Sequence, residues 1–174
     1  MRRFLILLAC ACGLVVAAVA ARPAKAPAVR LPDGDVYLKR IVVLKKETWR
    51  WQRLMGKPLT HALPRPVPPL PVRPTRWTRI AIVARLRAHH PPHLRAFLCI
   101  HRYEGSWTDS GGPYYGGLQM DWGFMSAYGR QLLRRKGTAD HWTPLEQIWV
   151  AERAYRNGRG FYAWPNTARY CGLI

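Results

Sequence analysis

One carboxylate stands out in the stretch from Cys99 to Met120, which reads CIHRYEGSWTDSGGPYYGGLQM. Glu104 closes an apolar run and is followed by a loop with five glycines and two adjacent tyrosines. Beside Tyr103 and Trp107, a carboxyl group at a helix end is partly removed from water, which favours the neutral form. A protonated carboxyl is what a general acid needs. We therefore expect acid–base chemistry at Glu104; the alternative is an ordinary surface glutamate in a turn.

Cleavage of a glycosidic bond fits this combination of residues. The reaction needs a protonated carboxyl that gives its proton to the leaving oxygen. Glycines let a sugar chain approach backbone amides, and aromatic rings offer flat faces for pyranose rings. Hydrolysis commonly uses a second carboxylate, for which Asp109 and Asp121 are the nearby candidates. However, Asp109 lies in a TDSGG turn where aspartate caps its own backbone, and Asp121 is placed to cap the next helix.

Helices are expected to position this loop. In the first, over residues 78–88, Ile80 and Val83, together with Leu86 or Ala84, are spaced as an apolar face. The second covers 93–103, with Gly105 placed to end it. Its apolar stripe is Leu94, Phe97, Leu98 and His101.

The rest of this region is expected to contain a short β hairpin and two more helices. The segment GSWTDSGGPYYGGLQM has the glycine and aromatic content of a hairpin. One helix is predicted over 122–136 and another over 144–157. The start of the latter is the clearest local signal, because Thr143, Pro144 and Glu146 form a capping box.

The N-terminal part divides into three segments of different composition. Residues 1–21 have two arginines, an apolar run and small residues, as in a secretory signal peptide; an uncleaved anchor and a lipoprotein attached at Cys10 are the alternatives. Residues 22–56 form a basic stem with helical spacing of apolar residues, which packs on a neighbour or touches membrane or wall. Residues 57–76 contain seven prolines and predict an extended, semi-rigid spacer. The functional domain is expected over 77–174.

Export would determine how the cysteines and the charge are interpreted. Cys10 and Cys12 would leave with the signal, so Cys99 and Cys171 would remain and are expected to pair. Such a bridge stabilises the folded protein by about 3 to 4 kcal/mol.

The chain has a formal net charge of +19. In a secreted protein this favours anionic wall polymers or anionic lipid as partners; no nucleic-acid module is recognised, so nucleic acid is not expected.

Four motifs occur in an informative order: YEGSW, then YYGGLQM about ten residues on, then EQIWVAE and YAWP. Together they resemble, in order and spacing, the catalytic domain of resuscitation-promoting factors and related transglycosylase-like proteins of actinobacteria. That family has a lysozyme-like fold and attacks the glycan strands of peptidoglycan. The resemblance covers residues 77–173 and implies the same fold and substrate class.

The resemblance assigns roles by motif. Glu104 matches the single catalytic glutamate of the family. Family members often carry one cysteine directly before that glutamate and another directly after the WP pair, whereas Cys99 and Cys171 lie several residues further out. The residues that the resemblance places at the sugar are Tyr114, Tyr115, Gly117, Gln119, Gln147 and Trp164.

The sequence thus predicts an α+β, mostly helical protein with a C-terminal lysozyme-like domain. We expect a secreted lytic transglycosylase acting on peptidoglycan, with no cofactor. The alternatives are a hydrolytic muramidase, a glycan-binding module without catalysis, and a cationic membrane-active protein. The HHPPH segment is not expected to bind a metal, because its prolines spoil helical ligand spacing. Whether an endopeptidase acts as a partner is left open.

Overall fold

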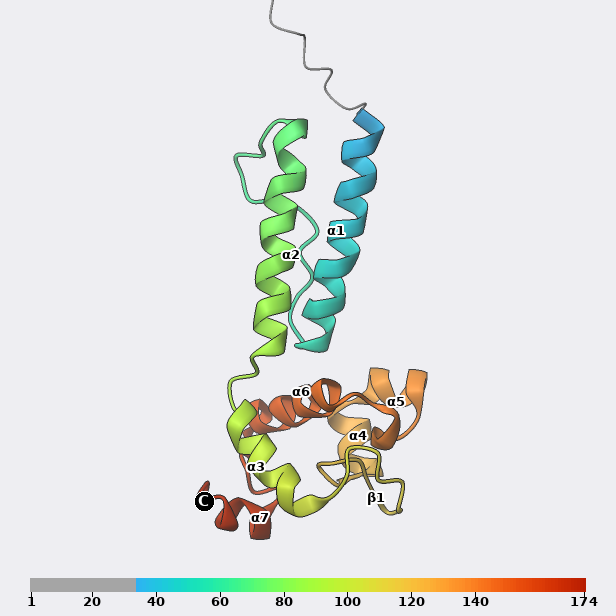
Figure 1. Cartoon of the computed structure of the whole chain (residues 1–174), viewed down its shortest axis with the longest axis vertical. Helices are drawn as coiled ribbons and strands as arrows, with labels where there is room; N and C mark the ends of the chain where they lie inside the picture. Colours follow the sequence, from blue (N-terminus) through green and yellow to red (C-terminus); the bar gives the residue numbers. More distant parts are fainter. Residues whose placement is uncertain (1–33) are drawn as a thin grey trace, which may run out of the picture. The chain divides into compact units, whose positions relative to one another are not determined.

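The computed structural model describes residues 34–174 (Figure 1). The expected signal peptide and the start of the basic stem lie outside the described residues. The described part is mostly helical with one two-stranded sheet, which confirms the expected α+β, mostly helical class. Within this part, no helix combines the length and the apolar character needed to span a membrane.

Two parallel helices begin the described chain. Helix α1 spans Gly34–Leu54 and α2 spans Arg73–His89, and the two pack side by side (Figure 1). The inward positions of α2 are Trp77, Ala81, Ala84 and Ala88. Of the predicted apolar face, the alternative Ala84 is confirmed as buried, whereas Val83 and Leu86 were wrong, since these side chains are 43% and 52% exposed. The alanines recur every three or four residues, and their small size lets the helices approach closely.

The proline-rich segment returns the chain along α1. Trp49 Nε1 donates to the Thr60 carbonyl at 2.7 Å, and the short helix η1 (Leu70–Val72) lies beside Gly34 at the start of α1. Parallel helices need a return connection as long as the helix, and an extended proline-rich chain at about 3.1 Å per residue covers that length economically. The segment therefore joins two packed helices rather than separating a stem from a domain, and Trp77 lies inside α2.

A group of short helices surrounds α6 in the C-terminal part. Helix α6 is largely buried, with Ile148, Val150 and Ala151 in the core. Its capping box is confirmed: Thr143 Oγ1 accepts from the Glu146 amide at 3.3 Å, and Glu146 Oε2 accepts from the Thr143 amide at 2.8 Å. The elements are α3 (Leu94–Glu104), β1 (Tyr114–Tyr115), β2 (Met120–Asp121), α4 (Trp122–Tyr128), α5 (Arg130–Lys136), η2 (Ala139–His141), α6 (Pro144–Ala154), η3 (Tyr155–Arg159) and α7 (Pro165–Tyr170).

The expected β hairpin is present, but the single helix predicted over 122–136 is two helices. Tyr114 pairs with Asp121, and Tyr115 with Met120, in an antiparallel ladder. The helix break falls at Gly129, where an added Cβ would lie 2.6 Å from the Trp142 ring. A side chain larger than that of glycine would therefore clash with Trp142 at the point where α4 ends and α5 begins.

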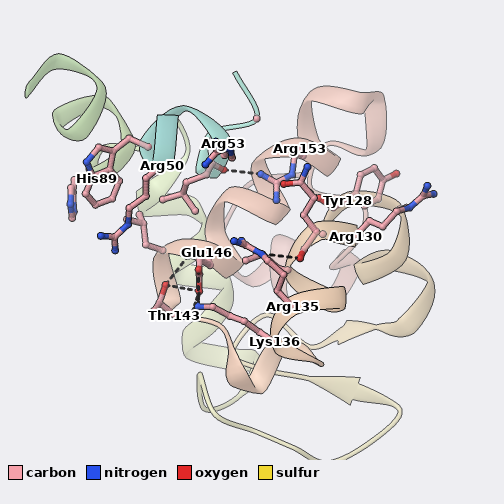
Figure 2. Close-up of a pocket in the computed structure, with 18 residues that line it drawn as sticks. Arg50, Arg53, His89, Tyr128, Arg130, Arg135, Lys136, Thr143, Glu146 and Arg153 are labelled. Atoms are coloured by element: carbon pink, nitrogen blue, oxygen red, sulfur yellow. Dashed lines mark hydrogen bonds and ion pairs between the residues drawn. The ribbon is translucent and has the colours of Figure 1, made fainter. Parts of the chain in front are cut away.

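Helix α6 also connects the parallel helix pair to the C-terminal part. Trp149 Nε1 donates to the Ala88 carbonyl at 2.7 Å, and Arg153 donates to the Leu54 carbonyl at 2.8 Å. A cavity of about 830 Å³ lies in this region, lined by the end of α1, by α5 and by the start of α6 (Figure 2).

Candidate functional site around Glu104

Glu104 is the last residue of α3. The helix buries Phe97 and Ile100, whereas Leu98, which we expected on the inner stripe, is 44% exposed. As predicted, the helix ends at Gly105. Gly105 has a φ of +156°, and an added Cβ would lie 3.2 Å from both the Asp109 carboxylate and the Gln119 amide. The loop therefore closes tightly on the end of α3 and needs glycine there.

Thr167 of α7 holds the Glu104 side chain. Glu104 is half-buried, and its Oε1 accepts a hydrogen bond from Thr167 Oγ1 at 2.7 Å. Thr167 itself is only 8% exposed. Within residues 34–174, no protein group hydrogen-bonds to Glu104 Oε2. The carboxyl is thus held through one oxygen by a neutral donor, while its other oxygen has no protein partner within the described residues.

The predicted disulfide between Cys99 and Cys171 is confirmed, with a Cα–Cα distance of 6.0 Å. It joins the middle of α3 to the residue that follows α7. Glu104 lies five residues after one cysteine, and Thr167 lies four residues before the other. The bridge therefore ties together the two helices that carry the Glu104–Thr167 pair.

Both nearby aspartates cap backbone, as the sequence predicted. Asp109 Oδ1 accepts from the Gly111 amide at 3.0 Å, and its Oδ2 accepts from Gln119 Nε2 at 2.9 Å. Asp121 Oδ1 accepts from the Phe124 amide at 2.6 Å at the start of α4. Each carboxylate therefore has a structural task in the loop or helix that contains it.

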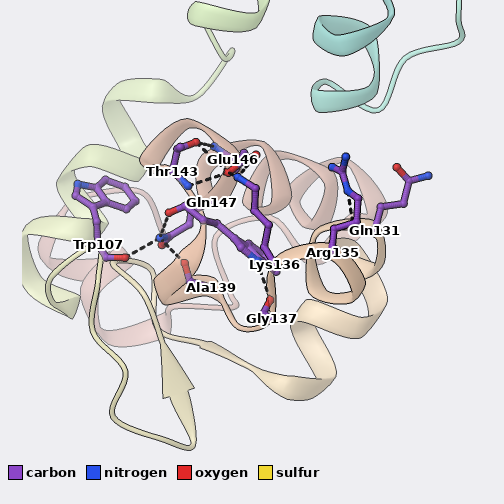
Figure 3. Close-up of polar contacts among 10 residues, drawn as sticks. Trp107, Gln131, Arg135, Lys136, Gly137, Ala139, Thr143, Glu146 and Gln147 are labelled. Carbon is purple, nitrogen blue, oxygen red and sulfur yellow. Dashed lines mark hydrogen bonds and ion pairs between the residues drawn. The ribbon is translucent and has the colours of Figure 1, made fainter.

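Gln147 holds the glycine loop from inside the protein. Its side chain is fully buried, and its Oε1 accepts from the Gly117 amide at 2.9 Å. Its Nε2 donates to the Trp107 carbonyl at 2.8 Å (Figure 3). An added Cβ at Gly116 would lie 2.5 Å from Gln147 Oε1, so the loop fits closely over the amide. The expected sugar contact of Gln147 is corrected on this geometry, because a side chain enclosed in this way does not reach a ligand.

Trp164 is also buried beneath the loop, and Gly117 is buried within the loop itself. Trp164 is 5% exposed, and its Nε1 donates to the Leu118 carbonyl at 2.6 Å. The Gly117 carbonyl lies 3.1 Å from His101 Nδ1, and the His101 ring stacks on Trp107 with 3.9 Å between centroids. Trp164 therefore supports the loop from the core, and its expected sugar contact is corrected in the same way as that of Gln147.

Three of the expected sugar-binding residues do reach the surface. Tyr114 is 50% exposed, and Tyr115 and Gln119 are half-buried. Gln119 has a φ of +45°, which is uncommon for a residue other than glycine, and its amide hydrogen bonds to Asp109 and to the Gly116 carbonyl hold it there. Strained positions of this kind gather at ligand-binding sites.

Two residues of α7 outside the sequence motifs also belong to the site, the buried Thr167 and the exposed Tyr170. Tyr170 of α7 is 74% exposed and packs on Tyr103 of α3 with 5.8 Å between ring centroids. Thr167 and Tyr170 belong to the segment PNTARY, which lacks any local catalytic signal. Each contacts a residue of α3 that lies more than sixty positions earlier in the chain, so no local pattern indicates either contact.

In the histidine-rich segment, the half-buried His93 pairs with a buried carboxylate. The carboxylate of Glu152, which is fully buried, accepts from the His93 amide at 2.6 Å and lies 3.2 Å from His93 Nδ1. Between residues 34 and 174, no three His, Cys, Asp or Glu side chains gather as metal ligands do.

Comparisons with protein-family models, with curated proteins and with solved structures give no significant match to this chain. A functional interpretation therefore depends on the motifs and on the geometry around Glu104.

Proposed function

We propose that this protein is a secreted enzyme that cleaves the glycan strands of peptidoglycan, as a lytic transglycosylase with a lysozyme-like catalytic domain. The observation that carries the proposal is the state of Glu104. One of its oxygens is held by Thr167 at 2.7 Å, and in the described chain the other has no protein partner. The ordered motifs shared with resuscitation-promoting factors support the same substrate class.

In the first step, Glu104 acts as the general acid. Its Oε2 proton passes to the glycosidic oxygen that links the muramyl residue to the next sugar, and the bond from the muramyl C1 to that oxygen breaks. Thr167 keeps donating to Oε1, so the proton is carried on the oxygen that faces the ligand. The hydrogen bond lowers the cost of orienting the carboxyl during this step.

In the second step, the same carboxylate acts as the general base. It takes the proton from the muramyl 6-hydroxyl, whose oxygen attacks C1 and forms a 1,6-anhydro ring. Glu104 is then protonated again and ready for the next bond. No water is consumed, so atoms and charge balance within the glycan strand.

The aspartates favour this route over hydrolysis. A retaining hydrolase needs a second carboxylate about 5 Å from the acid, and an inverting one leaves roughly 6.5 to 9.5 Å for a water. Asp109 and Asp121 both accept backbone hydrogen bonds that form the loop and the start of α4. Using either as a nucleophile or base would disrupt the structure that presents Glu104.

The exposed aromatic residues support binding of a sugar chain. Tyr103 and Tyr170 lie beside the Glu104–Thr167 pair on α3 and α7, and Tyr114 is exposed on β1. Flat aromatic faces suit the apolar faces of pyranose rings, and the strained Gln119 presents an amide close to Gly105. The cationic surface suits an exported protein that works among anionic wall polymers.

The test is mass spectrometry of the soluble fragments that the mature protein releases from purified peptidoglycan, compared with Glu104→Gln. Glutamine keeps an oxygen acceptor for Thr167 but cannot exchange a proton. We expect fragments with 1,6-anhydromuramyl ends from the wild type and none from the variant. Reducing ends that depend on Glu104 would instead indicate a hydrolase, and release by neither protein, with both still binding the wall, would indicate a binding module.

A further inference from the structure

A second region of the molecule has the opposite character to the Glu104 site. It is the cavity of about 830 Å³ lined by the end of α1, by α5 and by the start of α6 (Figure 2). None of the residues around Glu104 lines it. We refer to it as the cationic cavity, because its basic lining residues are Arg50, Arg53, His89, Arg130, Arg135, Lys136 and Arg153.

The single carboxylate in this lining is already engaged. Glu146 accepts from Lys136 Nζ through both oxygens, at 2.8 and 2.7 Å, and Oε2 also closes the capping box with Thr143. Burial raises the pKa of Glu146, but the hydrogen bonds from Lys136 and Thr143 and the Lys136 charge outweigh it and hold the pKa below its ordinary value. Glu146 therefore stays ionised and neutralises only Lys136.

In the described part of the chain, these arginines have no carboxylate partner. No ion pair within residues 34–174 involves Arg50, Arg53, Arg130 or Arg135. Arg153 is fixed by donation to the Tyr128 and Leu54 carbonyls at 2.6 and 2.8 Å. Several like charges around one cavity repel each other, and an anion placed among them would remove that repulsion.

Arg153 remains a cation despite its position. Burial, together with the nearby charge of Arg156, lowers the pKa of Arg153 to about 10, so its guanidinium is still protonated at neutral pH. Its two hydrogen bonds to carbonyls fix the guanidinium against the wall that α1 and α4 share. A positive charge held in place in this way needs little reorganisation when an anion binds.

We propose that the cationic cavity binds a phosphodiester group. Planar guanidinium groups bind phosphate oxygens through paired hydrogen bonds, and several arginines around one site are typical of phosphate recognition. Apolar side chains in the lining, among them Trp51 and Leu54, reduce the screening of these charges by water. The group would come from a polyol-phosphate wall polymer or from the headgroup of an anionic lipid, which share this chemistry.

Isothermal titration calorimetry with a short glycerol-phosphate oligomer tests the site at fixed low ionic strength. The variant is Arg130→Gln with Arg135→Gln, because both side chains are exposed on α5 and make only long hydrogen bonds, of 3.4 and 3.3 Å, to backbone carbonyls. The matched control is Arg79→Gln with Arg85→Gln, which removes the same charge from the exposed side of α2. Thermal unfolding of both variants checks that they are folded.

We expect the α5 variant to bind at least tenfold more weakly than the wild type and the α2 control to change by less than threefold. Equal weakening in both variants would indicate diffuse attraction by net charge and would overturn the site. If the oligomer fails to bind but phosphatidylglycerol vesicles bind in an α5-dependent manner, the group is a lipid headgroup; binding of neither overturns the proposal. Glu104→Gln should bind the oligomer as tightly as the wild type does. The outcome of this test is therefore independent of whether Glu104 cleaves peptidoglycan.

Discussion

The Glu104 site and the cationic cavity use the same type of side chain in opposite ways. Glu104 is held by one neutral hydroxyl, and within the described chain its second oxygen is unpartnered. Glu146 has both oxygens on the Lys136 ammonium and also closes a capping box. In the proposed function the first carboxyl exchanges a proton with the glycan, whereas the second is an ionised structural group. The partners of a glutamate, rather than its presence in a motif, decide which chemistry it can perform.

The largest expected effect comes from removing each carboxylate in turn. Glu104→Gln should lower turnover of peptidoglycan at least a thousandfold, since general acid–base catalysis contributes about 10² to 10⁴ in each of the two proposed steps. Glu146→Gln should leave turnover within about twofold, because it acts only in the capping box and the ion pair. Initial rates of anhydromuropeptide release measure both, and comparable losses in the two variants would contradict the distinction.

Replacing Gln147 should remove the support of the Glu104 loop without affecting the cationic cavity. Gln147→Leu leaves the Gly117 amide and the Trp107 carbonyl buried without partners, so we expect a loss of about 2 to 4 kcal/mol in the free energy of unfolding. Denaturant unfolding measures this, with the exposed Gln131→Leu as the control, expected to stay within about 0.5 kcal/mol. A Gln147 variant as stable as the control would mean that the loop is held by other contacts.

A smaller effect is expected from the hydroxyl that orients Glu104. Thr167→Val keeps the shape of the side chain but removes the donor, and we expect about a tenfold lower kcat with little change in KM. Thr167→Ser retains the hydroxyl and should restore most of the rate. If valine and serine lower the rate equally while both proteins unfold at the same temperature, Thr167 serves packing alone.

The smallest effect concerns the pH dependence of stability on the cavity side. The pKa of Glu146 is below its ordinary value in the folded protein, so this group stabilises the fold above its unfolded pKa and loses that contribution as the pH falls through the folded value. Lys136→Met should therefore reduce the loss of stability between pH 6 and pH 3, by less than about 1 kcal/mol. Parallel pH curves for the two proteins would show that the ion pair contributes nothing.

Local signals in the sequence predicted local structure well. The capping box at Thr143, the helix end at Gly105 and the caps at Asp109 and Asp121 depend on residues only a few positions apart. The disulfide followed from counting the cysteines that would remain after export. The caps and the helix end depend on hydrogen bonds within a single turn of the chain. The disulfide could be predicted because only two cysteines would remain to pair.

Contacts between distant segments could not be predicted in this way. Gly129 lies against Trp142 at the break between α4 and α5, and the inner face of α2 consists largely of alanines that fit against α1. Gln147 looked like a surface residue of a motif, but it lies under a loop thirty residues earlier in the chain. The contact of Thr167 with Glu104 and the gathering of arginines around the cationic cavity likewise follow from the packing of α7, α1 and α5, which the sequence alone does not show.

Helix α6 places a restriction on how this protein can change. Glu146 and Gln147 are neighbours in the chain, yet one serves the cationic cavity and the other the Glu104 loop. Successive residues of an α-helix are turned by about 100°. A one-residue insertion or deletion in α6 would therefore rotate Arg153 away from the cavity or Gln147 away from the loop, so substitutions can alter either region separately, but changes in the length of this helix must affect both.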